Sequence, residues 1–350
     1  MAVNTGSLRV AQTLAGASQG GAENFFSRLA KGLQGTGAIT QKAFIRGHEH
    51  RLQSLRSGGV AVEGFRFGGP LNQVDHFRFR RALRTFQPDI VLSWMNRASK
   101  LTPKGDYTLV SRLGHYYNLK YYRHCDYWLG ISRGICDYLV RGGMPANRVF
   151  HIPNFADEAE VEPLPRDSFD TPVDRPLLLA AGRLHINKGF DTLLQALSKV
   201  PDAVLWLAGA GPEEGALKEL CSELGLSERV RFLGWRADVT ALMRTADIFI
   251  CPSRHEGLGS VIMESWAHGC PVIATDSQGP GELIESGVTG IVTPVDQPGP
   301  LAEAISSLVT DEVARNQLAA TAQSHYRKHF SRSVVLDQYI DLFDQLKRTT

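Results

Sequence analysis

The chain has 350 residues, of which 43% are hydrophobic and 21% charged, and this composition is typical of a soluble globular protein and excludes a low-complexity chain. Its length exceeds one ordinary α/β domain, so we expect two domains of similar size. Basic residues outnumber acidic ones 21 to 8 in residues 1–155, whereas acidic residues outnumber basic ones 28 to 17 in residues 156–350. The basic first half indicates a polyanionic partner, which is anionic lipid, a phosphorylated glycan or nucleic acid.

The amino-terminal residues 1–17 contain one arginine and no cationic segment before an apolar run, so they predict a first strand rather than a signal peptide. The longest apolar stretches fall far short of the roughly 20 residues that a membrane-spanning helix needs. We therefore expect a cytoplasmic protein without a transmembrane segment. The odd number of cysteines and the lack of a C-x-x-C pair predict reduced, mostly buried thiols at Cys125, Cys136, Cys221, Cys251 and Cys270.

Strand and helix patterns alternate through the first half. A strand over 8–13 is followed by a loop to Gly21 and then by helical apolar spacing over 22–34. Further strands are predicted at 42–45, 90–93, 108–111, 127–131 and 149–152. Such alternation is typical of a doubly wound parallel sheet.

An acidic segment with several prolines, residues 154–176, interrupts the alternation and predicts a domain boundary. We expect an α/β fold of two Rossmann-like parallel-sheet domains that face a central cleft, with residues 1–160 in the first domain and 170–331 in the second. A last helix, about 332–350, is expected to pack back on the first domain. The second domain repeats the alternation, with strands predicted at 177–181, 203–208, 230–233, 248–251, 272–275 and 290–292.

Two loops in the second half have the pattern of a phosphate site. Residues 182–189 (GRLHINKG) lie between a predicted strand and helix, where Arg183 and Lys188 suit adjacent phosphates beside a helix amino-terminus. The alternative is an exposed basic loop. Gly209 and Gly211 follow the next strand, but the third glycine of the dinucleotide fingerprint is missing, so a tight turn is the simpler interpretation.

The segment 253–276 (SRHEGLGSVIMESWAHGCPVIATD) is the most informative part of the chain. Gly257 and Gly259 bring backbone N–H groups close to a ligand at the start of a short predicted helix over 258–268, whose amino-terminus suits an anion. Glu256 lies before this helix and Glu264 about one turn inside it, so the two carboxylates can bind different hydroxyl groups of one extended ligand. The alternative is one acid that favours the helix dipole and one solvated glutamate.

Taken together, residues 175–310 resemble the donor domain of family 4 glycosyltransferases of the GT-B fold. In the first half, GGAE at 20–23 resembles the family's loop that contacts donor phosphates and acceptor, and VFHIPNF at 149–155 resembles the segment before the linker. The resemblance in the second half is carried by GRLHINKG at 182–189, AGAGP at 208–212, VRFLG at 230–234 and EGLGSVIMESWAHGCPVIA at 256–274.

The resemblance implies a role for each motif residue. Arg183 and Lys188 neutralise the diphosphate, Glu264 binds the ribose hydroxyls and Glu256 engages the transferred sugar. Such enzymes retain the anomeric configuration and are described as metal-independent, and because the sequence has no D-x-D motif we expect neither a metal nor another cofactor. The remaining donor-binding positions are the backbone groups of Leu258, Gly259 and Ser260 and the glycines Gly20, Gly21, Gly209 and Gly211.

Relatives also carry a histidine near the sugar in the first domain. The matching region is 109–117, where His115 is our candidate and Arg112 the alternative, although a solvated or core histidine fits the pattern equally.

Residues 75–86 (DHFRFRRALRTF) interleave apolar side chains with four arginines. This pattern predicts an amphipathic cationic helix that lies in the headgroup region of an anionic membrane. The alternative is a solvated helix that packs through its phenylalanines. We do not expect a nucleic-acid partner, because no recognised nucleic-acid module accompanies the charge.

The combined interpretation is a retaining, hexosyltransferase-type glycosyltransferase at the cytoplasmic face of the membrane. It moves a sugar from a nucleoside-diphosphate sugar to a glycan or lipid-linked acceptor in cell-envelope polysaccharide or lipopolysaccharide-core synthesis. Two alternatives belong to other classes. An NAD-dependent oxidoreductase needs G-x-G-x-x-G after the first strand, which residues 16–21 (GASQGG) do not supply. A non-catalytic nucleotide-sugar-binding protein keeps the fold but loses the phosphate-binding residues, which are present here.

Overall fold

The computed structural model describes residues 8–18, 20–68 and 72–349, with the side chains of residues 72, 348 and 349 outside the description. The chain divides into two compact units, one made of residues 1–154 and 332–350 and the other of residues 155–331. Residues 155–160, which the sequence pattern placed in the first domain, therefore group with the second unit.

The first unit is built on a parallel sheet of seven strands. The strand β3 was missed from the sequence, because its run AVEGF contains a glutamate and a glycine and only its last residue is buried. In spatial order the strands are β3 (Ala61–Phe65), β2 (Ile39–Arg46), β1 (Leu8–Leu14), β4 (Ile90–Trp94), β5 (Thr108–Leu113), β6 (Tyr127–Gly130) and β7 (Val149–His151).

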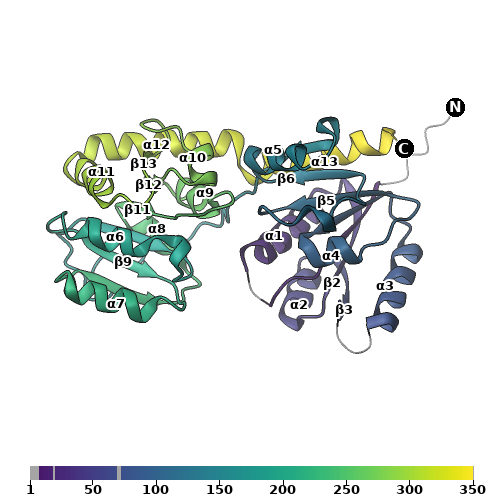
Figure 1. Cartoon of the computed structure of the whole chain (residues 1–350), viewed down its shortest axis with the longest axis horizontal. Helices are drawn as coiled ribbons and strands as arrows, with labels where there is room; N and C mark the ends of the chain where they lie inside the picture. The colour runs from purple at the N-terminus through teal and green to yellow at the C-terminus, as the bar shows by residue number, and fades with distance from the viewer. Residues whose placement is uncertain (1–7, 19, 69–71, 350) are drawn as a thin grey trace. The chain divides into compact units, whose positions relative to one another are not determined.

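The last helix of the chain, α13 (Arg332–Thr349), belongs to the first unit, where it packs on α1 (Gly21–Thr36) and β1 (Figure 1). Gly32 of α1 allows the close approach, since a Cβ there lies 2.9 Å from the Leu336 side chain. The remaining helices of this unit are α2 (Glu49–Ser57), α3 (Asn72–Phe86), α4 (Met95–Leu101), α5 (Arg133–Arg141) and the short 3₁₀ turns η1 (Leu119–Tyr121) and η2 (Ala146–Arg148).

The second unit contains a parallel sheet of six strands in the order β10 (Val230–Gly234), β9 (Val204–Ala208), β8 (Leu177–Ala181), β11 (Ile248–Cys251), β12 (Val272–Thr275) and β13 (Ile291–Thr293). Its four central strands, β9, β8, β11 and β12, are buried along nearly their whole length, as their continuous apolar runs require. Its helices are η3 (Ile186–Lys188), α6 (Phe190–Leu197), α7 (Glu214–Glu223), α8 (Val239–Thr245), α9 (Ser260–Ala267), α10 (Gln278–Leu283), α11 (Pro298–Thr310) and α12 (Glu312–His329).

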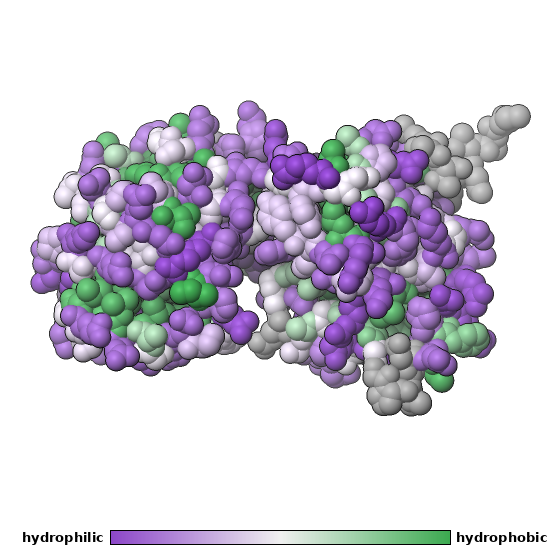
Figure 2. Space-filling view, in the orientation of Figure 1, coloured by the Kyte–Doolittle hydropathy of each residue, from purple (hydrophilic) through white to green (hydrophobic). Residues whose placement is uncertain are grey.

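These two parallel-sheet units confirm the predicted α/β fold class. The five cysteines are free thiols, and all but Cys136 are buried. None of the helices in the described ranges is both long and apolar enough to cross a lipid bilayer. The surface seen in Figure 2 is mainly hydrophilic with smaller apolar patches.

Candidate functional site

The loops that follow β8 and β11 in the second unit bring together an ion pair. Lys188, in η3, donates its Nζ to the Glu256 carboxylate, which lies 68 residues later in the loop before α9. The two side chains are 24% and 20% exposed, so the pair is largely shielded from solvent. Burial acts to lower the pKa of Lys188, but the neighbouring Glu256 carboxylate raises it, with the result that its pKa lies above the ordinary value of 10.5. Lys188 therefore carries a positive charge at neutral pH.

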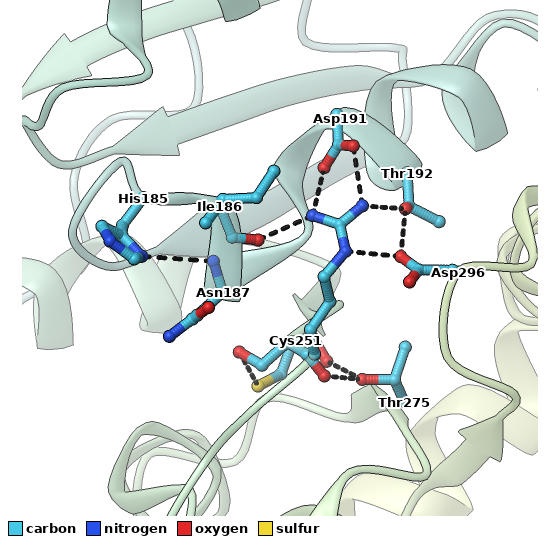
Figure 3. A network of polar contacts seen from close by, with 10 residues as sticks. His185, Ile186, Asn187, Asp191, Thr192, Cys251, Thr275 and Asp296 are labelled. Atoms are coloured by element: carbon cyan, nitrogen blue, oxygen red, sulfur yellow. Dashed lines mark hydrogen bonds and ion pairs between the residues drawn. The ribbon is translucent and has the colours of Figure 1, made fainter.

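Arg254, two residues before Glu256, connects three loops. Its guanidinium donates to both Asp191 carboxylate oxygens, at 2.9 and 2.7 Å, to Asp296 Oδ1 at 2.6 Å and to the Ile186 carbonyl at 2.6 Å. Figure 3 shows Asp191, Thr192 and Asp296 around this group. The hydrogen bonds to Asp191 raise the pKa of Arg254. Since Ile186 belongs to η3, the network fixes the turn that carries Lys188.

Backbone contacts pack the same loops closely. Arg254 donates its backbone N–H to the Asn187 carbonyl at 2.8 Å. Gly189 has a φ of 61° and lies so close to the Pro252 carbonyl that a Cβ there falls 2.1 Å from the oxygen. The two loops therefore have no room for a side chain at this position, and the relative placement of Lys188 and Glu256 follows from the backbone.

The start of α9 presents backbone donors. Leu258 and Gly259 donate their N–H groups to no acceptor among the described residues, whereas Ser260 begins the helix. Gly259 adopts a left-handed conformation with a φ of 80°, and Leu258 is buried. Glu264 is half-buried one turn inside α9. The helix start and the Lys188–Glu256 pair follow neighbouring strands, and together they suit an anionic ligand that carries hydroxyl groups.

Arg183 is exposed and makes no hydrogen bond or ion pair with any residue in the described ranges. Gly209 and Gly211 lie beside the Arg183 loop, where a Cβ on Gly209 falls 1.8 Å from the Gly182 carbonyl oxygen and one on Gly211 falls 2.2 Å from that of Leu184. The Gly209 N–H donates to the Gly234 carbonyl at 2.7 Å. These glycines thus allow the close packing between the two loops.

In the first unit, Gly20 and Gly21 lie at the start of α1. The buried Glu23 side chain turns back toward this loop, so that a Cβ on Gly20 falls 2.2 Å from Glu23 Oε2. Glu23 Oε1 accepts the Ala17 N–H at 2.8 Å, and Arg51 donates to the Ala17 carbonyl at 2.9 Å. Burial lowers the pKa of Arg51, although the Glu23 carboxylate acts in the opposite direction. The glycine-rich loop is therefore held by a buried acid and a buried base.

The two candidates, Arg112 at the end of β5 and His115 after it, have different surroundings. His115 is exposed, and its Nδ1 accepts the Tyr116 N–H at 2.8 Å. Arg112 is only 2% exposed: its guanidinium lies 4.2 Å from the Trp94 ring centroid and its Nε donates to Tyr339 Oη at 2.9 Å. Arg112 also donates to the Asn154 side chain. Arg112 is therefore a core residue that joins β5 to α13.

Sequence reasoning missed Arg254 and its partner Asp191 as parts of this site. The available signal was their position, since Arg254 lies two residues before Glu256 and Asp191 two residues after Gly189. Residues of opposite charge that lie close to glycines in two separate segments can form an ion pair between those segments.

Comparison with known proteins supplies the family. Residues 163–325 match the model of the glycosyl transferases group 1 family. The lipopolysaccharide core biosynthesis glycosyltransferase LpsE of Rhizobium meliloti (strain 1021) is 35% identical over 92% of this chain and 95% of its own length. The chain is a group 1 glycosyltransferase. LpsD of the same organism is 33% identical over 94% of this glycosyltransferase and 96% of its own length.

A solved structure shares the whole fold of this glycosyltransferase. Anabaena HepE in complex with UDP-glucose aligns with a TM-score of 0.83 and 22% identity, over 96% of this chain and 99% of that one. The match covers both units, so the enzyme has the GT-B arrangement of two parallel-sheet α/β domains.

Proposed function

We propose that this glycosyltransferase is a retaining enzyme of family 4 that transfers a hexose from a nucleoside-diphosphate sugar to a glycan or lipid-linked acceptor. We further propose that it acts in lipopolysaccharide-core or related cell-envelope polysaccharide synthesis, as the names of LpsE and LpsD indicate for those relatives. The observation that carries the proposal is the shielded Lys188–Glu256 pair beside the start of α9. The UDP-glucose bound to HepE, a protein of the same fold, supports a nucleotide-sugar donor.

In the proposed reaction, the bond between the anomeric carbon and the diphosphate oxygen breaks, a bond to an acceptor hydroxyl forms, and the acceptor loses a proton. Negative charge develops on the leaving diphosphate, so fixed positive groups aimed at it lower the barrier. Lys188 is held charged by Glu256, and Arg183 is exposed without a protein partner in the described ranges. Leu258 and Gly259 add two backbone donors.

The two carboxylates take different parts of the donor in this proposal. Glu264 accepts hydrogen bonds from the ribose hydroxyls. Glu256 engages the transferred sugar, and its ion pair with Lys188 orients the lysine. Gly20 and Gly21 contribute the loop that approaches donor and acceptor, and His115 contacts the sugar. We propose that two cations and a helix start replace a metal ion, so that the reaction needs no cofactor.

We also propose that the first unit binds the acceptor and associates with the cytoplasmic face of the membrane through α3. Val74 and Phe77 are 60% and 61% exposed on this helix, and Arg80 and Arg81 are exposed on the next turn. An apolar pair flanked by arginines suits the headgroup region of an anionic bilayer. Sedimentation with phosphatidylglycerol vesicles tests this step: Phe77→Ser should weaken binding, and unchanged binding contradicts it.

Thermal unfolding with UDP-, GDP-, ADP- and dTDP-sugars tests the donor. A sugar nucleotide at about 100 times its Kd should stabilise the protein by about 2.7 kcal/mol. Glu264→Gln should reduce this shift, whereas Glu256→Gln should lower turnover more than nucleotide affinity. Glu303→Gln, on the exposed face of α11, is the matched control. The absence of any nucleotide shift, or equal nucleotide affinity in all variants, refutes the assigned roles.

A further inference from the structure

A hollow of about 620 Å³ lies in the first unit, at the carboxyl ends of the neighbouring strands β2 and β3. Its volume is within the range of about 300–1,000 Å³ that is typical of small-ligand sites. The described residues that line it include the basic side chains of Arg46, His48, Arg66 and Arg78 and one acid, Asp75. Ligands of open parallel sheets bind at this end of the strands.

The acid does not neutralise the arginines directly. Asp75 is only 6% exposed, and its carboxylate accepts the backbone N–H groups of Arg66, at 3.1 and 3.0 Å, and of Phe67, at 2.9 Å. Asp75 therefore fixes the chain after β3 against the first turn of α3. The consequence is a rigid wall from which the Arg66 side chain extends.

The three arginines have no ionic partner among the described residues. Arg46 ends β2 and is half-buried, Arg66 directly follows β3, and the Arg78 guanidinium lies 5.9 Å from the Phe65 ring centroid. Contact with a ring face leaves the N–H edges of a guanidinium available to an acceptor. Planar guanidinium groups pair best with phosphate and carboxylate oxygens.

His48 connects this hollow to the glycine-rich loop. Its Nε2 lies 3.4 Å from the Gly16 carbonyl, in the loop that leads to Gly20 and Gly21. A ligand in the hollow therefore lies beside the loop to which the proposed function gives donor and acceptor contacts. Leu52, Gly64 and Phe65 also line the hollow, whose volume is large enough to admit a sugar ring.

We propose that this hollow binds an anionic substituent, a phosphate or carboxylate group, on a glycan acceptor. Arg46, Arg66 and Arg78 hold the anion, and His48 lies at the side that faces the glycine-rich loop. This inference rests on the proposed acceptor role of the first unit. It adds the chemical class of acceptor, which is an acidic or phosphorylated sugar.

Isothermal titration of the full chain with mannose 6-phosphate and with mannose, each in the presence of excess UDP, tests the proposal. We expect mannose 6-phosphate to bind measurably and mannose not to bind. The triple variant Arg46→Gln, Arg66→Gln, Arg78→Gln should weaken mannose 6-phosphate binding by about tenfold or more. A control triple variant with the same loss of charge, at exposed positions outside the hollow, is Arg123→Gln, Arg141→Gln, Arg148→Gln, and its affinity should stay within about twofold of the parent.

Equal weakening in both triple variants, or equal binding of mannose and mannose 6-phosphate, overturns the proposal. It is also overturned if the first triple variant loses only its binding to phosphatidylglycerol vesicles, since the arginines then contact a membrane. The thermal shift with the four sugar nucleotides separates this inference from the donor assignment. A parent chain that shows no shift with any of them contradicts the proposed function, whereas a normal shift with unchanged sugar-phosphate binding in the first triple variant contradicts the hollow alone.

Discussion

Replacing Arg254 by alanine removes a guanidinium that ties three loops of the second unit together. Its side chain is 18% exposed, and its partners Asp191 and Asp296 are 34% and 53% exposed. Breaking a fully buried pair costs about 3–5 kcal/mol, whereas exposed pairs contribute about 0–1 kcal/mol. Because the aspartates here regain water, we expect a loss of about 2–3 kcal/mol.

This loss should lower the melting midpoint of the second unit by about 5–10 °C, given the scaling of about 2–4 °C per kcal/mol for domains of this size. Circular dichroism of the full chain measures it. Arg236→Ala is the control, because Arg236 forms its ion pair with Asp238, two residues away, and the change should cost less than about 1 kcal/mol. An Arg254→Ala protein that melts like Arg236→Ala refutes the reasoning.

The same pair predicts a dependence on pH. Burial acts to raise the pKa of Asp191, but its hydrogen bonds and the charge of Arg254 outweigh burial and place the pKa below the ordinary 3.8. Because the folded-state pKa is lowered, ionised Asp191 stabilises the folded protein above pH 3.8. This stabilisation is lost as the pH falls through the folded-state pKa. The stability difference between the parent and Arg254→Ala should therefore shrink between pH 5 and pH 2. A constant difference across that range contradicts the assigned pair.

Two further outcomes follow from packing and burial. Gly209→Ala places a Cβ 1.8 Å from the Gly182 carbonyl oxygen at a φ of 149° and should destabilise the protein by more than about 3 kcal/mol. The control Gly215→Ala, in helix α7 with nothing within 4 Å of the added Cβ, should stabilise the protein by about 0.5–1 kcal/mol. Changes of the same sign in the free energy of urea unfolding contradict this packing. Burial raises the pKa of Cys270 and of Cys125 to about 12. Iodoacetamide at about pH 8 should therefore modify both thiols far more slowly in the native chain than in urea, and peptide mass spectrometry measures the two rates. Equal rates refute the burial of these thiols.

The sequence predicted most strands of both units, because each is a short apolar run bounded by loop residues. The edge strand β3 was not predicted, because Glu63 and Gly64 interrupt its apolar pattern. The glycine-containing motifs that follow β8 and β11 predicted where these strands end, because the spacing of glycines is visible within a short stretch of sequence. The pairing of Lys188 with Glu256 spans 68 residues and depends on how two loops meet, which no local pattern encodes.

Arginine environments were the least predictable feature. Arg112 follows a strand pattern that permits either an exposed or a buried side chain, and only the packing of Trp94 and Tyr339 around it decides for burial. The roles assigned to His115, Glu264 and the glycines remain predictions, because they concern a donor molecule.

The origin of Tyr339 in the last helix has a consequence for protein synthesis. The first unit needs α13 to supply this partner for the buried Arg112, yet α13 is made only after the whole second unit. Domains generally fold as units, and amino-terminal ones usually fold first during translation. Here the order is reversed: residues 155–331 can complete their fold before α13 has been made, and the first unit can finish only after it.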